Sequence, residues 1–96
     1  MKLQNAIERI LTENNFEKQS LYIYLFGSAV NNIECHDIDL LIVYNDIEYK
    51  RILMLRQKLY DRLSCLFQKE IDIVLLTENE AYITKFIEEE KCELLI

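Results

Sequence analysis

The sequence predicts an α/β fold, in which a small mixed β-sheet is flanked by helices. Three observations indicate this class. Segments with apolar residues at helical spacing recur along the chain, three short runs are rich in the branched and aromatic residues typical of buried strands, and the two kinds of segment alternate. The 96 residues, of which 51% are hydrophobic, suffice for one modest core, so we expect a single domain over residues 1–96.

The first half of the chain predicts one helix and two strands. Apolar residues at helical spacing predict an amphipathic helix over residues 2–13, and the run at 21–26 reads as a buried strand. A second apolar run covers 37–44. The nine residues that follow Gly27, 28–36, are enough for a return without a full crossover helix, so we expect the strands to be antiparallel.

The second half predicts a long helix, a third strand and a final helix. Apolar spacing indicates the long helix from Asp46 to about Phe67, with Asn45 or Asp46 as its cap. Its cations predict a solvated face; they are Arg51, Arg56, Lys58 and Arg62. Residues 70–76 form the third strand. The pattern from Thr77 to Glu80 matches a capping box, so a helix is expected from residue 78 to about 92.

Composition restricts the possible partners. A net charge of −6 argues against extended nucleic-acid binding, which normally needs a basic surface. Apolar stretches are too short to cross a membrane, and the N-terminus lacks a signal-peptide pattern. The three cysteines form no C-x-x-C pair. We therefore expect reduced thiols, a cytoplasmic location and no membrane contact.

Two neighbouring features are candidates for chemistry. Gly27 is the only glycine and ends an apolar run, where backbone with positive φ or a close approach to a ligand is expected. Gly27 and Ser28 can present backbone amides and a hydroxyl to phosphate; alternatively they form an ordinary turn in which Ser28 caps a helix. Asp37 and Asp39 share one strand face, an arrangement that favours a divalent cation between them. The alternative is a solvated strand start.

A third acid lies on a later strand. Asp72 shares a strand face with Glu70, and either carboxylate is placed to join Asp37 and Asp39 if the strands are neighbours. A surface acid near a strand start is the simpler alternative. Hard carboxylate oxygens are the ligands that magnesium prefers, and a pair of magnesium ions is suited to transfer at a phosphate.

These residues resemble the signature of the minimal nucleotidyltransferases of the DNA polymerase beta superfamily. That signature is a Gly-Ser turn, a loop, Asp-x-Asp, and a carboxylate on a later strand, matched here by Gly27, Ser28, Asp37, Asp39 and Asp72. The resemblance spans most of the chain. It implies the nucleotidyltransferase fold and the transfer of AMP from ATP to an acceptor hydroxyl, with two Mg²⁺ ions as cofactors.

The resemblance also implies roles and a partner. Gly27 and Ser28 would hold phosphate, Asp37 and Asp39 would bind both metal ions, and Asp72 would complete one metal site and activate the acceptor. Stand-alone chains of this type resemble the antitoxin of HEPN/nucleotidyltransferase toxin–antitoxin pairs, which adenylylates a tyrosine of the HEPN toxin. We therefore expect ATP and a HEPN-type protein as partners.

The loop departs from the family pattern. Residues 28–36 contain neither the arginine nor the second glycine that often follow the Gly-Ser turn in the family. Because that arginine would help to bind the triphosphate, its absence predicts weaker nucleotide binding. His36, the only histidine, has no zinc-ligand spacing and is expected to be structural or exposed. Two alternative functions follow. One is a binding module that neutralises a partner by contact, and the other is a transferase for a small molecule or a tRNA end that works as a homodimer.

Overall fold

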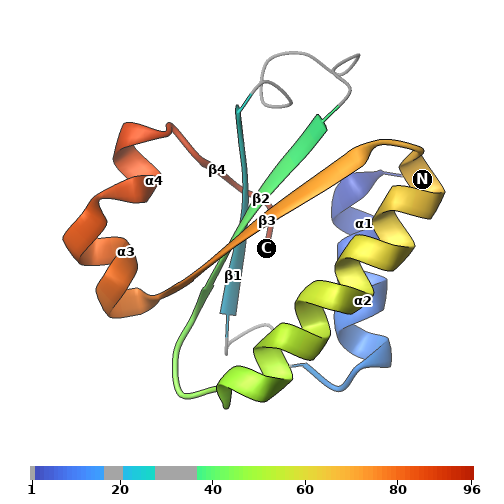
Figure 1. Cartoon of the computed structure of the whole chain (residues 1–96), viewed down its shortest axis with the longest axis horizontal. Helices are drawn as coiled ribbons and strands as arrows, with labels where there is room; N and C mark the ends of the chain where they lie inside the picture. The colour runs from blue at the N-terminus through green and yellow to red at the C-terminus, as the bar shows by residue number, and fades with distance from the viewer. Residues whose placement is uncertain (1, 17–20, 28–36) are drawn as a thin grey trace.

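The computed structural model describes residues 2–16, 21–27 and 37–96, and Figure 1 shows its sheet lying between two layers of helices. The elements are, in order, α1 (Leu3–Glu13), β1 (Leu21–Phe26), β2 (Asp37–Tyr44), α2 (Tyr49–Phe67), β3 (Glu70–Thr77), α3 (Glu78–Thr84), α4 (Phe86–Glu89) and β4 (Glu93–Leu94). Helices α1 and α2 cover one face of the sheet, and α3 and α4 cover the other. The predicted α/β class is confirmed.

The sheet is mixed, with the strand order β3-β2-β1-β4. β1 runs antiparallel to β2, as predicted, and also to β4, whereas β2 and β3 are parallel. The α2 helix supplies the crossover that a parallel pair requires. As a consequence, the end of β1 and the starts of β2 and β3 lie at one end of the sheet.

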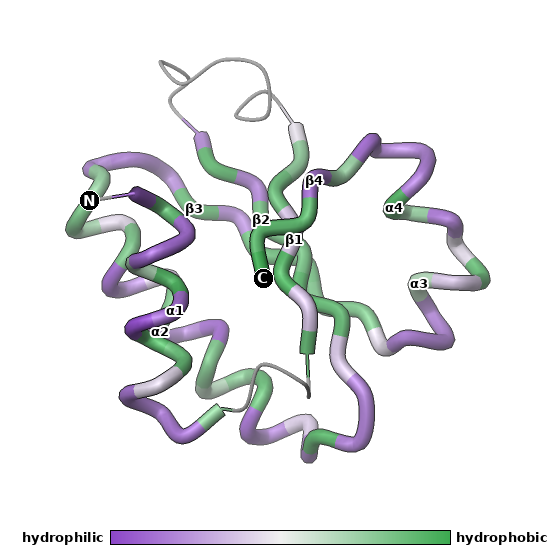
Figure 2. The backbone as a smooth tube through the Cα atoms, turned by 180° about the vertical axis from the view of Figure 1, so that it is seen from behind, coloured by the Kyte–Doolittle hydropathy of each residue, from purple (hydrophilic) through white to green (hydrophobic). Residues whose placement is uncertain are grey.

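Alternate residues of β1, β2 and β3 enter two separate cores, as the period of two in a strand requires. On the α1/α2 face, β2 contributes Ile38, Leu40 and Ile42, all at most 5% exposed. On the α3/α4 face it contributes Leu41 and Val43 to a smaller cluster. Figure 2 shows hydrophobic residues gathered along the central strands and hydrophilic residues along the helices. Because α1 and α2 bury the larger set, they form the main support of the sheet.

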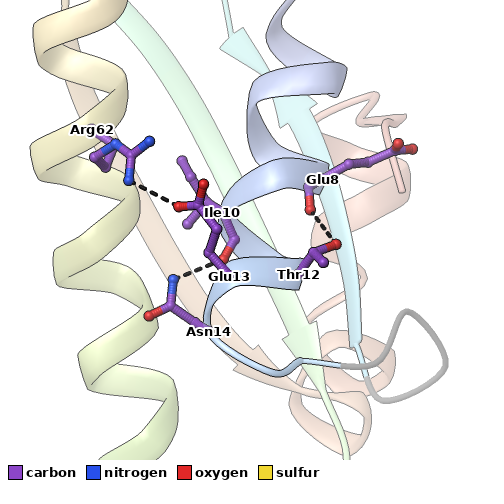
Figure 3. Close-up of polar contacts among 6 residues, drawn as sticks. All are labelled: Glu8, Ile10, Thr12, Glu13, Asn14 and Arg62. Carbon is purple, nitrogen blue, oxygen red and sulfur yellow. Dashed lines mark hydrogen bonds and ion pairs between the residues drawn. The ribbon is translucent and has the colours of Figure 1, made fainter.

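Polar contacts stabilise the C-terminal end of α1 and connect α1 to α2 (Figure 3). The Asn14 side-chain amide donates to the Ile10 carbonyl at 2.7 Å, which satisfies a carbonyl at the end of the helix. Arg62 of α2 donates to the Glu13 carboxylate at 3.0 Å. Both partners are nearly half exposed, so this ion pair contributes at most about 1 kcal/mol. The apolar faces, rather than this pair, hold the two helices together.

The start of α2 differs from the prediction. The helix begins at Tyr49 after Glu48, and no side chain caps it, so Asn45 and Asp46 are not its caps. Asp46 instead adopts a left-handed conformation with φ 54°. The chain therefore turns at Asp46, directly after β2, before it can lie back on the sheet. Asp and Asn tolerate this conformation better than other residues with a side chain.

The single helix predicted over 78–92 is wrong. The capping box is present, with the Thr77 hydroxyl accepting from the Glu80 amide and the Glu80 carboxylate accepting from the Thr77 amide. Lys85, however, is left-handed with φ 55° and separates α3 from α4. The short strand β4, which was not predicted, then pairs with β1. A continuous helix would carry the chain away from the sheet, whereas the break lets it return.

The last residues of the chain pack on the sheet. The backbone of Ile23 accepts from Leu95 at 2.8 Å, and the side chains of Leu95 and Ile96 contact the main core. Within the described part of the chain, no helix is both long and apolar enough to cross a membrane.

Candidate active site

Three carboxylates project from one end of the sheet. In the parallel register of β2 and β3, Asp39 lies directly opposite Asp72, and Asp37 lies opposite Glu70. On the other side of β2, Asp39 is opposite Phe26, the last residue of β1. Neighbouring strands are about 4.8 Å apart, so Asp39 and Asp72 start from adjacent backbone positions.

The acids all lie on the α3/α4 face. Ile38 separates Asp37 from Asp39 and points into the main core at 5% exposure, while Ile71, beside Asp72, is 3% exposed in the same core. The aspartates therefore project to the opposite face. The structure brings together Asp37, Asp39 and Asp72 as the sequence pattern predicts. Glu70 shares the face but sits beyond Asp72, opposite Asp37.

Burial and the neighbouring acids both act on the pKa of Asp39. Burial raises the pKa of Asp39 above its usual range, and the negative charges of Asp72 and Asp37 and a hydrogen bond with Asp72 raise it further. Each of these effects opposes ionisation, because a second charge or a dry surrounding disfavours a carboxylate. The site thus concentrates negative charge that a bound cation would neutralise.

Gly27 is adjacent to the same carboxylate. Its φ of +74° lies in the left-handed region, and a Cβ built there would overlap Oδ2 of Asp39 and lie 3.2 Å from its Cγ. Glycine is therefore required for both backbone conformation and space, as expected from its position at the end of β1. The Asp39 carboxylate lies against the bare backbone at the turn where phosphate binding was predicted.

An apolar wall borders these acids, and the sequence did not indicate it. The Phe26 and Phe86 rings meet edge to face, with centroids 5.1 Å apart and an interplanar angle of 89°. Phe26 is the cross-strand neighbour of Asp39. This contact ties α4 to the end of β1, and it depends on the break at Lys85. No pattern in the sequence marks that break, because Lys85 is not a residue type that usually adopts it.

The donor chemistry at this end of the sheet fits a magnesium ion. Carboxylate oxygens are the ligands that Mg²⁺ prefers. Burial raises the pKa of Asp39 most, and repulsion from Asp72 and Asp37 adds to it; a bound cation would offset that repulsion. Among the described residues, however, no three acidic, histidine or cysteine side chains already form a group able to hold an ion. Asp39 and Asp72 are a facing pair, with Asp37 close enough to act on Asp39 through its charge.

Ser28 and His36 lie outside the described residues, as does the rest of the loop at 28–36 with its missing arginine. Their predicted roles stay predictions. Gly27 is the last described residue before that loop.

Comparison with known sequences identifies the family. The model of the family described as "Polymerase beta, Nucleotidyltransferase" matches residues 5–95, which is nearly the whole chain. This chain belongs to that family. A search of curated proteins found no relative.

Solved structures share the fold of this nucleotidyltransferase domain. One is a mutant of the toxin-antitoxin MntA-HpeT, with a TM-score of 0.65 and 20% identity over 99% of this chain and 73% of that chain. Another is a toxin-antitoxin with AMP-PNP, with a TM-score of 0.65 and 21% identity over 99% and 73% of the two chains. At these identities the matches establish the fold. They confirm the predicted nucleotidyltransferase architecture.

Replacing Gly27 by alanine tests the close approach to Asp39. We expect Gly27→Ala to lower the free energy of unfolding by more than about 1 kcal/mol, because the left-handed conformation and the overlap with Asp39 both oppose a Cβ. Urea denaturation measures the loss. In an Asp39→Ala background the overlap is relieved, and only the conformational part of the loss remains. Equal losses in both backgrounds would show that Asp39 does not lie against Gly27.

The raised pKa of Asp39 predicts a pH-dependent stability. Folding raises this pKa, so the associated stability is present at low pH and is lost as pH rises through the raised value. Asp39→Asn should therefore be more stable than wild type at pH 7 without divalent cations, and its advantage should shrink as the pH falls. Thermal unfolding with a chelator measures both.

Asp46→Asn is the matched control for Asp39→Asn, because it removes the same charge from an exposed residue beyond the opposite end of β2. We expect it to change the free energy of unfolding by less than about 0.5 kcal/mol. A destabilised Asp39→Asn protein at pH 7 would contradict the proposed crowding of carboxylates.

Proposed function

We propose that this chain transfers AMP from ATP to a hydroxyl of a partner protein, with magnesium as the cofactor. The observation that carries the proposal is the placement of Asp72 directly opposite Asp39, with Asp37 on the same face. Membership of the nucleotidyltransferase family supports the reaction class. The approach of Asp39 to the Gly27 backbone adds a turn suited to phosphate beside the acids.

Each residue has a distinct proposed role. Asp37 and Asp39 would hold two Mg²⁺ ions, and Asp72 would share one of them. Bound magnesium supplies charge neutralisation at the phosphates and at the attacking oxygen. The Gly27 backbone and Ser28 would orient the triphosphate, because bare amides and a hydroxyl are donors to phosphate oxygens.

The proposed transfer exchanges a phosphoanhydride bond of ATP for a phosphoester bond to the acceptor. The acceptor oxygen forms a bond to the α-phosphorus of ATP, and the bond from that phosphorus to the bridging oxygen of the β-phosphate breaks. Pyrophosphate leaves, and the acceptor proton passes to Asp72. Asp72 is exposed at the open edge of the sheet, where an incoming hydroxyl can reach it.

A protein acceptor is favoured by the structural relatives of the chain. Two structures with the same fold are toxin-antitoxin systems, and one contains AMP-PNP. We infer an antitoxin role toward a HEPN-type toxin, in which AMP on the toxin would be the product.

A contact-only binding module is the second candidate. The loop at 28–36 lacks the arginine expected to help hold the triphosphate, which favours weak nucleotide binding. In this case the partner would be neutralised by the interface alone, and the three acids would be dispensable. A small-molecule transferase working as a homodimer is a further possibility, distinguished by the acceptor it modifies.

A transfer assay separates these functions. The protein is incubated with Mg²⁺ and labelled ATP, with and without the product of the neighbouring gene, and intact mass spectrometry looks for one added AMP. We expect addition to the partner, and Asp72→Asn should slow it by about 10² to 10⁴-fold, since a general base contributes about that much. Asp37→Asn combined with Asp39→Asn should abolish it.

Partner binding by the same variants is measured in parallel, with Asp46→Asn as the charge control. Lost transfer with retained partner binding supports the enzyme. Unchanged neutralisation of the partner by the double variant would contradict it and would support the binding module.

A further inference from the structure

The outer edge of β3 is open along the same strand that carries Asp72. β3 pairs with β2 in one continuous register from Glu70 to Thr77, and in the described chain no strand lies on its other side. Edge strands are normally protected by charged side chains, especially lysine, by proline or by a bulge. β3 contains no proline, lysine or arginine, its charged residues Glu70 and Asp72 are confined to its start, and its eight residues pair without interruption. Its outward backbone groups can therefore accept another strand.

A groove runs beside this edge on the α1/α2 face. It has a volume of about 200 Å³ and is lined by Arg56, Gln57 and Tyr60 of α2 and by Ile71 and Ile73 of β3. The Gln57 amide donates to Asp61 at 2.9 Å. Arg56 is exposed, and none of the ion pairs or side-chain hydrogen bonds of the described residues involves it. The groove thus offers a cation and a phenol above an aliphatic floor.

The two faces of the β3 edge differ in charge. Ile71 and Ile73 line the groove with its Arg56, whereas Asp72 between them projects to the face of the other acids. In a strand paired with β3, successive side chains would alternate between these faces. In the added strand, a residue on the Asp72 face would lie between two residues that face Arg56 and Tyr60. An acidic side chain is favoured at those two flanking positions because it would meet Arg56, and it is disfavoured at the central position because it would meet Asp72.

We propose that the β3 edge and this groove bind the acceptor segment of the partner protein as an added strand. The segment carries a hydroxyl residue next to Asp72 and an acidic residue on one or both sides of it. Main-chain hydrogen bonds provide affinity in this mode, and the alternate side chains provide specificity. The inference rests on the proposed function for the transfer step, in which AMP from ATP joins this hydroxyl and pyrophosphate leaves.

Binding of synthetic peptides tests the proposal without ATP, so that it is separate from catalysis. The probes are end-blocked heptapeptides, Val-Thr-Glu-Tyr-Glu-Thr-Val and its analogue with lysine in place of both glutamates. We expect the glutamate peptide to bind at least about tenfold more tightly, because lysine would oppose Arg56. When the glutamate peptide binds, hydrogen exchange should slow at the β3 amides that do not bond to β2. Methylation of alternate backbone nitrogens of the peptide should abolish binding.

Two charge reversals on α2 locate the contact. Arg56→Glu should invert the preference in favour of the lysine peptide. Lys58→Glu is the matched control, because it makes the same charge change on the same helix but lines a different hollow, with Asn14 and Phe16. It should leave the preference unchanged.

Three results would overturn the proposal: equal binding of both peptides, an Arg56→Glu variant with unaltered preference, or unprotected β3 amides. Sedimentation that shows a dimer held by the β3 edge would assign the edge to a second copy and would also overturn it. A peptide that binds as expected but accepts no AMP with Mg²⁺ and ATP would count against the proposed transfer alone.

Discussion

The site depends on the opposition of Asp39 and Asp72 across two parallel strands. The register of β2 and β3 fixes that opposition over eight residue pairs, and the buried apolar face of α2 packs against these strands and holds the register. A slip by one residue would send Asp72 to the other face, where Ile71 now packs in the main core. The core therefore enforces a pairing of like charges that the acids alone would avoid.

The surroundings of Asp39 oppose the ionisation of its carboxyl group rather than stabilise the charged form. The Gly27 backbone closes on one side of it, Phe26 neighbours it across the strand pair, and Asp72 faces it on the next strand. Such local electrostatic cost is typical of functional sites, where binding of a ligand removes it. The unfavourable electrostatic free energy of the carboxylates is confined to one end of the sheet, whereas the apolar middle of β2 stabilises the fold.

The sequence predicted most of the sheet and the three acids because both follow short-range rules. Period-two alternation and a run of branched residues defined β1, β2 and β3, and the same alternation placed Asp37 and Asp39 on one face. The break at Lys85 and the strand β4 were missed because they arise from packing of Phe86 on Phe26 and from pairing with β1. The groove at Arg56 combines two elements from different parts of the chain, which no local pattern reveals.

The most direct test of the opposed carboxylates is a pH titration of Asp39 followed through its carboxyl carbon by NMR. In wild type without divalent cations, we predict a pKa of Asp39 above the usual range for an aspartate. Asp72→Asn should lower this pKa, because it removes the negative charge with the larger effect on Asp39. Burial would keep part of the increase in that variant. A pKa of Asp39 that does not respond to Asp72→Asn would show that the two carboxylates do not share one site.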